Sequence, residues 1–437
     1  MTREKKAQLR RRKLASAVCA ALGVVASMPA YADAELDALK QEMAAQRKMI
    51  DELRAGQQKP AAPAPGATQF SVYGIADVGI VNADSGFGRK TRLEGGGGLA
   101  SSRLGMRATK TFEGGVRALA VAEAGVHFDT GSTGNQAPTR GINVTQASSG
   151  GADGSGSQIF ARQIFAGLAG EKFGQLTIGR QYTGSYVAAA VVGSAWPDGL
   201  YGTTASFTPI IGGMPTRVNN SIVWSTPAVV GLRGVLTYTT GSENNVAAPT
   251  AATATTTTTD EAGQGWDAAL LYNIGGFNAA VTTWNVNNTS WVTAGETGLA
   301  ERKGFQVSAN YNFGFLKVSA NYVNGKIEGG NYENVTRVLS KADGYGVSML
   351  VPIGNHNLVA TYTSVNDKSA LNRDGKLLGV GYFYKLFTDT AIYVHYGKMN
   401  NNANGSYTLN DATNLVGNLS TPGFDPSSVG VGLNYRF

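Results

Sequence analysis

The chain has 437 residues, with 37 Lys or Arg against 30 Asp or Glu and a formal net charge of +7. The excess is local, because residues 1–32 hold seven basic side chains and one acidic one, which leaves 30 basic and 29 acidic residues in the rest. That balance excludes a basic tail for nucleic acid. The single cysteine, Cys19, excludes a disulfide within the chain.

The first 32 residues have the pattern of a secretory signal peptide. A basic start is followed by an apolar run from Leu14 to Met28 and then by Ala30-Tyr31-Ala32, which fits the small-residue rule for cleavage. A membrane anchor is the alternative, but a spanning helix needs about 20 apolar residues. We therefore expect a secreted mature chain that begins at Asp33.

Residues 33–55 differ from everything that follows, because apolar side chains fall on the a and d positions of heptads. This pattern predicts a short coiled coil, and fewer than three heptads are marginal for an isolated helix. The alternative is a surface helix that packs on its own chain. Residues 56–69, rich in Pro and Ala, predict a semi-rigid linker. The expected coiled-coil core is Leu36, Leu39, Met43, Ile50 and Leu53, with Gln46 as its polar site.

From Phe70 to Phe437 the sequence consists of segments with the alternating pattern of strands. Very short and long connections join these segments by turns. An even number of strands with this asymmetry is typical of a transmembrane barrel. The prediction is an all-β fold, an antiparallel barrel of about 16 strands. The short connections are 109–115, 169–174, 227–231, 274–277, 313–315, 352–355 and 386–389, and the long ones are 84–99, 129–157, 183–216, 243–263, 288–302, 326–340, 367–374 and 400–425.

The strands have one apolar face and one polar face. Phe305, Val307 and Tyr311 alternate with Gln306 and Ser308, so one face can meet lipid and the other water. Lipid offers the backbone no hydrogen bonds, which requires every strand edge to be paired and the sheet to close. A barrel of this size is too wide for side chains to fill and holds a water channel.

The last strand alternates as well, with Val429, Val431, Leu433, Tyr435 and Phe437 on one face. An ordinary edge strand at the end of the chain is the alternative. A strand that ends on an aromatic residue suits the aromatic girdle of a barrel. We expect this strand to close the barrel.

Several segments, in this order and spacing, resemble the general porins of Gram-negative bacteria, most closely the trimeric porins of beta-proteobacteria. The resemblance covers residues 70–437, and the N-terminal extension is not part of the usual pattern. The matching segments are Ser71-Val72-Tyr73-Gly74-Ile75-Ala76-Asp77, Ser102-Arg103-Leu104-Gly105-Met106, Phe165-Ala166-Gly167-Leu168, Thr177-Ile178-Gly179-Arg180-Gln181, Asn220-Ser221-Ile222-Val223-Trp224 and Tyr435-Arg436-Phe437.

The resemblance implies an outer-membrane homotrimer that passes small hydrophilic solutes and ions by passive diffusion. It also implies that Tyr435 and Phe437 belong to the signal recognised by the barrel-assembly machinery. The helix of residues 33–55 would then be periplasmic. Whether it joins three subunits or tethers the barrel to peptidoglycan stays open.

The resemblance further implies that the third long loop, residues 183–216, folds into the barrel opposite wall arginines. Rings of arginine favour anions, so we expect mild anion selectivity. The alternative for each arginine is a solvated or carboxylate-paired residue without effect on selectivity. Strand alternation places Arg103 and Arg107 on the same, lumen-facing side of their strand and turns Arg117 and Glu123 inward. It places Arg180 on the same face of its strand as Leu176 and Ile178. The expected constriction residues are Arg103, Arg162 and Arg217, then Arg107, Arg117 and Glu123, and Asp198 in the loop.

The sequence gives little support for catalysis. Its three histidines, His127, His356 and His395, are far apart and lack metal-ligand spacing. We expect no enzyme activity, no metal and no cofactor. The remaining alternatives are a substrate-selective channel and a surface adhesin or structural β protein, which would show a fixed internal repeat.

Overall fold

The computed structural model describes residues 66–86, 88–95, 98–134, 159–195, 216–241, 264–288, 300–328, 341–407, 409–410, 415–416 and 422–437. The chain divides into two units, Met1–Pro63 and Ala64–Phe437, and the described residues all belong to the second. The predicted signal peptide, the coiled coil and most of the linker lie outside them. In this described part, no helix is both long and apolar enough to cross a membrane.

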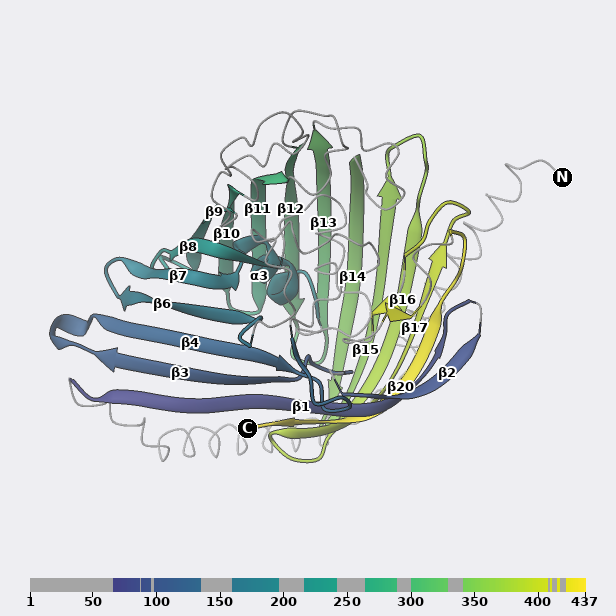
Figure 1. Cartoon of the computed structure of the whole chain (residues 1–437), viewed down its shortest axis with the longest axis horizontal. Coiled ribbons are helices and arrows are strands. Elements are labelled where there is room, and N and C mark those ends of the chain that lie inside the picture. Colours follow the sequence, from purple (N-terminus) through teal and green to yellow (C-terminus); the bar gives the residue numbers. More distant parts are fainter. Residues whose placement is uncertain are drawn as a thin grey trace, which may run out of the picture. The chain divides into compact units, whose positions relative to one another are not determined.

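Sixteen long antiparallel strands form a closed barrel, as predicted (Figure 1). The short strands β2 (Arg89–Glu94), β5 (Thr133–Gly134), β18 (Leu409–Asn410) and β19 (Leu415–Val416) belong to the long connections. The barrel strands are β1 (Thr68–Asp84), β3 (Arg103–Thr111), β4 (Arg117–Val126), β6 (Gln163–Gly170), β7 (Gly174–Tyr182), β8 (Arg217–Ser225), β9 (Leu232–Thr240), β10 (Gln264–Ile274), β11 (Phe277–Asn288), β12 (Ala300–Asn312), β13 (Lys317–Glu328), β14 (Lys341–Ile353), β15 (His356–Asp367), β16 (Gly375–Lys385), β17 (Thr390–Asn401) and β20 (Ser427–Arg436).

The end of the chain closes the barrel, as the alternation of the last strand predicted. Strand β20 pairs with β17 on one side and with β1 on the other. The backbone N–H of Gly74 donates to the carbonyl of Phe437 at 2.9 Å, and the N–H of Phe437 donates back to Gly74 at 3.2 Å. A Cβ atom at Gly74 would lie 2.4 Å from the Phe437 ring and 2.9 Å from the backbone carbonyl oxygen of Arg103, so this close approach favours glycine.

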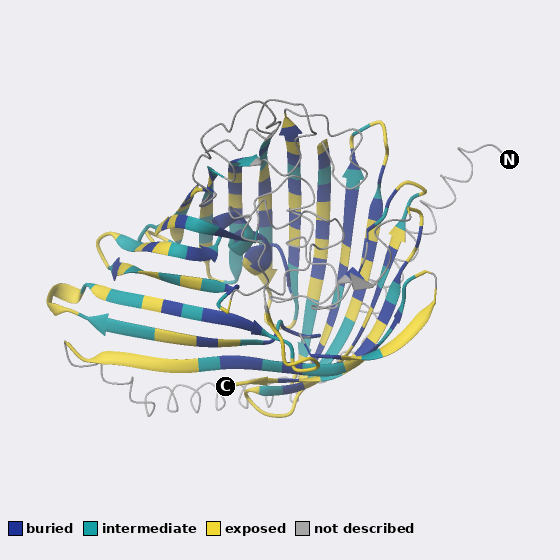
Figure 2. Cartoon of the chain, viewed as in Figure 1, coloured by how far each residue is buried: buried dark blue, intermediate teal, exposed yellow. Residues whose placement is uncertain are grey.

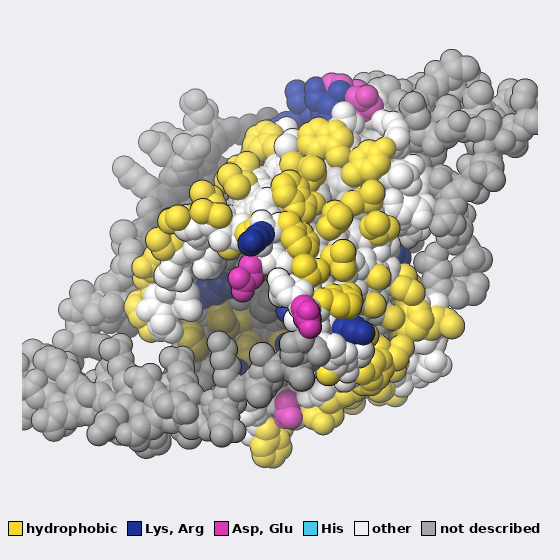
Figure 3. Space-filling view, turned by 90° about the vertical axis from the view of Figure 1, so that its left-hand side faces the viewer, with side chains coloured by type: hydrophobic (Ala, Val, Ile, Leu, Met, Phe, Trp, Pro, Cys, Tyr) yellow, Lys and Arg dark blue, Asp and Glu magenta, His cyan; other side chains and the backbone are white. Residues whose placement is uncertain are grey.

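The two faces of the strands differ as expected. On β12, Phe305, Val307 and Tyr311 are exposed on the outside, whereas Gln306 and Ser308 are buried. Buried and exposed bands alternate along the strands in Figure 2, and hydrophobic side chains spread over the outside of the barrel in Figure 3. The apolar outer face suits lipid and the polar inner face suits water.

A buried aspartate fastens the seam of the barrel. Asp77 of β1 is 0% exposed. Its carboxylate accepts hydrogen bonds from the N–H groups of Gly98 (2.8 Å), Leu99 (3.0 Å) and Ala100 (2.8 Å) in the first long connection. It also accepts from the Tyr393 hydroxyl of β17 at 2.6 Å and the Asn434 amide of β20 at 2.7 Å. One side chain therefore joins β1, β17, β20 and the first loop.

Candidate pore constriction

The third long connection, residues 183–216, is called loop 3 here, and residues 183–195 and 216 of it are described. It begins directly after β7 with the short helix α3 (Gly184–Val187), which continues as the π-helix η4 (Ala188–Val192). The Thr183 hydroxyl caps this helix by accepting from the N–H of Tyr186 at 3.3 Å. The N–H of Thr183 bonds the carbonyl of Thr216 at 3.2 Å and so closes the base of the loop.

Loop 3 is fixed to the inner wall by a series of contacts from β9 to β14. Its first turn donates to β9 and β10, through Gly184 N–H to the Thr237 hydroxyl (3.4 Å) and Ser185 N–H to the buried carboxylate of Asp267. The carbonyl of Val192 accepts from the Asn310 amide of β12 at 2.9 Å, and the N–H of Ala195 donates to the Ser348 hydroxyl of β14 at 2.7 Å. The described start of loop 3, residues 183–195, therefore lies against the inner wall of the barrel.

Arginines gather on the wall formed by β3 to β8. The name arginine cluster is used here for Arg103, Arg107, Arg162 and Arg217. The Arg162 Nε atom bonds the Glu123 carboxylate at 2.7 Å, and both residues are 4% exposed. Arg103 and Arg217 lie within electrostatic reach of the same carboxylate. Of the four, Arg103 is half-buried and Arg107 is exposed to solvent.

Two tyrosines that the sequence analysis did not single out complete the arginine cluster. The Tyr73 hydroxyl donates to Glu123 at 3.1 Å, and the Arg107 guanidinium lies 5.9 Å from the centre of the Tyr73 ring. The hydroxyl of Tyr182, at the end of β7, accepts from both Arg162 and Arg217, each at 2.7 Å. Only its position immediately before loop 3 could have drawn attention to Tyr182.

Arg180 is buried because the strand is irregular at that point. The pairing of β7 with β8 shifts register between Gly179 and Gln181, and Gly179 has a φ of 137°. This β-bulge turns Arg180 away from the lipid face that simple alternation assigns to it. Its guanidinium donates to the Ala161 carbonyl at 2.7 Å and to the Asn219 amide oxygen.

One expected constriction residue, Arg117, does not join the cluster. Arg117 pairs with Thr111 and Ala169 beside the tight turns. It lies six residues along β4 from Glu123, which corresponds to about 20 Å. Asp198 lies outside the described residues. Arg103, Arg107, Arg162, Arg217 and Glu123 are thus the expected residues that the fold brings together.

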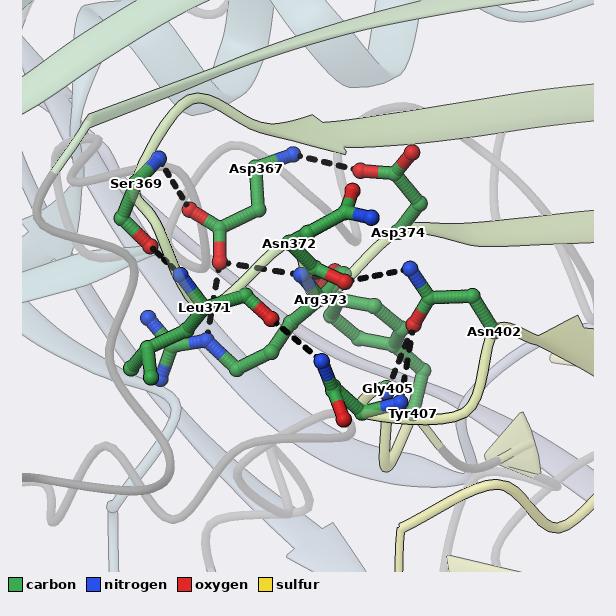
Figure 4. Close-up of polar contacts among 10 residues, drawn as sticks. Asp367, Ser369, Leu371, Asn372, Arg373, Asp374, Asn402, Gly405 and Tyr407 are labelled. Atoms are coloured by element: carbon green, nitrogen blue, oxygen red, sulfur yellow. Dashed lines mark hydrogen bonds and ion pairs between the residues drawn. The ribbon is translucent and has the colours of Figure 1, made fainter.

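The long-loop side of the barrel carries a second polar network, which links residues 367–374 to residues 402–407 (Figure 4). The Asp367 carboxylate accepts from the Arg373 Nε atom at 2.9 Å and from the Ser369 N–H at 2.9 Å. The Tyr407 hydroxyl donates to the Arg373 carbonyl at 2.7 Å. Burial, and then the Asp367 carboxylate, raise the pKa of Tyr407, so this hydroxyl keeps its proton. These bonds join residues 367–374 to residues 402–407, and we expect them to stiffen both connections.

The comparison with known proteins agrees with this geometry. The model of the family described as Gram-negative porin matches residues 15–405. The chain belongs to the Gram-negative porin family. Within the described segments of this porin, no three His, Cys, Asp or Glu side chains gather as a metal site.

Individual relatives cover nearly the whole barrel. An outer membrane porin protein of Bordetella pertussis is 26% identical over 418 residues, which are 86% of this chain and 96% of that protein. The solved structure of an anion-selective porin from Comamonas acidovorans has a TM-score of 0.59 at 20% identity, covering 85% of this chain and 100% of that one. OmpT of Vibrio cholerae, solved in a trimer form, has a TM-score of 0.57 at 14% identity, covering 85% and 100%.

Family and fold together establish what this porin does. It is an outer-membrane channel whose water-filled interior lets small hydrophilic solutes diffuse passively. The outward apolar face and the inward polar face described above are the physical basis of both properties.

Proposed function

We propose that this porin prefers anions and that the arginine cluster sets the preference. The observation that carries the proposal is the gathering of three guanidinium groups, those of Arg103, Arg162 and Arg217, around the carboxylate of Glu123, with a fourth, that of Arg107, beside Tyr73. The ion pair between Arg162 and Glu123 cancels one positive charge and leaves three. A narrow, low-dielectric passage focuses the field of such charges and raises the local concentration of anions. The chain shares its fold with an anion-selective porin of Comamonas acidovorans, which supports the proposed anion preference.

The ion preference is tested by reversal potentials in planar bilayers across a gradient of potassium chloride. The wild type should give a chloride-to-potassium permeability ratio above one. The double variant Arg103→Gln/Arg107→Gln removes the two cluster arginines that reach solvent and should lower the ratio by at least about twofold. Arg117→Gln removes the same charge from the same barrel outside the cluster and serves as the matched control. A wild type that prefers potassium would refute the proposal.

A substrate-selective channel is distinguished by the same recordings. A general diffusion pore conducts in proportion to solute concentration, whereas a selective channel saturates and is blocked by its ligand. We propose the general pore, since the arginine cluster offers charge, which acts on small ions of one sign in general.

We further propose that the porin is a homotrimer and that residues 33–55 form a periplasmic coiled coil of three helices, after removal of the signal peptide 1–32. The a and d spacing of Leu36, Leu39, Met43, Ile50 and Leu53 supports a helical bundle, and Vibrio cholerae OmpT was solved as a trimer. Deleting residues 33–69 should then lower the melting temperature of the trimer in detergent. If the trimer melts unchanged while binding to isolated peptidoglycan is lost, the segment is a tether instead.

A further inference from the structure

One hydroxyl oxygen stands between two like charges in the constriction. Arg162 and Arg217 come from separate parts of the wall, and an Nη2 atom of each donates to the oxygen of Tyr182 at 2.7 Å. A tyrosine oxygen has two lone pairs, so both are used by guanidinium groups. Both arginines are buried, Arg162 at 4% and Arg217 at 5% exposed. Buried charges are screened less than exposed ones, so the positions of these groups affect the field in the pore.

The alternative partner for Arg217 is the Glu123 carboxylate. Arg217 already acts on it electrostatically, and Arg162 and Tyr73 already bond it. A guanidinium bonds a carboxylate more strongly than a neutral oxygen. Without the Tyr182 oxygen, the two guanidinium groups would lose their shared acceptor, and Arg217 would turn toward Glu123. Arg217 would then pair with Glu123, so the positive field in the constriction would weaken although no arginine is removed.

Loop 3 holds the bridging ring. Tyr186 of α3 stacks on Tyr182 with ring centres 5.0 Å apart and an angle of 11° between the planes. The Arg217 guanidinium lies 4.4 Å from the centre of the Tyr182 ring, which adds a cation–π contact. The loop and the arginine wall therefore meet at Tyr182.

We propose that Tyr182 is a positioning residue for ion selectivity: it holds Arg162 and Arg217 as one two-guanidinium unit, keeps Arg217 away from Glu123 and is itself held by Tyr186 of loop 3. This inference rests on the anion preference proposed above and assigns part of it to a side chain without charge. The ring of Tyr182 orients the unit, and its oxygen supplies the shared acceptor.

The test is Tyr182→Phe, which removes one oxygen, keeps the ring and leaves every charge in place. The chloride-to-potassium permeability ratio from reversal potentials should fall by about twofold relative to the wild type. Tyr407→Phe is the control, because it also removes a buried hydroxyl, but that hydroxyl donates to the Arg373 carbonyl in the loop network of Figure 4 and bonds no arginine of the cluster. Its ratio should equal that of the wild type. An unchanged ratio in Tyr182→Phe would overturn the proposal.

A second comparison separates positioning from direct contact with the passing ion. In an Arg217→Gln background the guanidinium that Tyr182 keeps from Glu123 is gone, so adding Tyr182→Phe should change the ratio little. An equal additional fall in that background would mean that the hydroxyl acts on ions by itself and would also overturn the proposal. The permeability ratio of the wild type alone tests the anion preference. The change in this ratio between wild type and Tyr182→Phe tests whether Tyr182 positions Arg162 and Arg217.

Discussion

Asp77 offers the strongest test of how the barrel is held closed. Replacing it with Ala removes the acceptor of five hydrogen bonds, three from backbone N–H groups and two from Tyr393 and Asn434. A hydrogen bond to a charged group contributes about 1.5–3 kcal/mol, but the five do not add, since the first loop can loosen and admit water. A buried donor left without an acceptor costs about 1–3 kcal/mol, and because five donors lose theirs while the loop can relax, we expect Asp77→Ala to cost about 3–5 kcal/mol in total.

Asp77→Asn should cost less, because only one of the two oxygens becomes a donor. The amide nitrogen is tolerated best at the position of Oδ1. That oxygen accepts only from the Gly98 N–H and the Tyr393 hydroxyl, and the hydroxyl can rotate so that it accepts from the amide instead. The Gly98 N–H is then left without an acceptor, which costs about 1–3 kcal/mol. The expected order of stability is wild type, then Asn, then Ala.

The assay is urea unfolding of the protein refolded into lipid vesicles, followed by tryptophan fluorescence. A loss of stability lowers the midpoint while the slope stays constant. Asp84→Ala is the matched control, because Asp84 lies on the same strand but pairs with Arg89 at the surface, and its midpoint should stay at the wild-type value. If Asp77→Ala unfolds at the same urea concentration as Asp84→Ala, the seam does not depend on this carboxylate.

Three further changes have defined outcomes. Asp267→Ala removes the acceptor for Ser185 and should release the start of loop 3, which would raise single-channel conductance and current noise; steady wild-type currents would show that the other anchors suffice. Gly179→Ala would place a Cβ atom 2.3 Å from the Ile164 carbonyl in a backbone region that disfavours side chains. We expect it to lower the urea midpoint by an amount equivalent to at least about 1–3 kcal/mol, whereas Gly88→Ala, with open space around it, should not. Asp367→Asn weakens the contact to Arg373 and should speed protease cleavage at residues 368–374 without altering ion selectivity; slower or equal cleavage would contradict a stiffening role.

The sequence by itself determined the class of fold and most of the strand boundaries. Alternation along a strand is a local property, because neighbouring side chains point to opposite faces. In a barrel with lipid outside and water inside, this produces alternating apolar and polar residues in the sequence. The loop predicted over 183–216 lies between β7, which ends at Tyr182, and β8, which begins at Arg217. Alternation also turned Arg103, Arg107 and Glu123 toward the interior together.

The tertiary structure decided which of those residues meet. Asp77 is bonded to partners 316 and 357 positions away, and no local pattern marks such pairs. Arg180 escapes the rule of alternation because the pairing of β7 with β8 is irregular there: two residues of β8, Asn219 and Asn220, stand opposite Arg180 alone. Arg117 obeys the rule yet lies far from the cluster, since alternation fixes the face of a strand and not the height at which strands align. Closure of the barrel set those heights, and with them the Tyr182 bridge between Arg162 and Arg217.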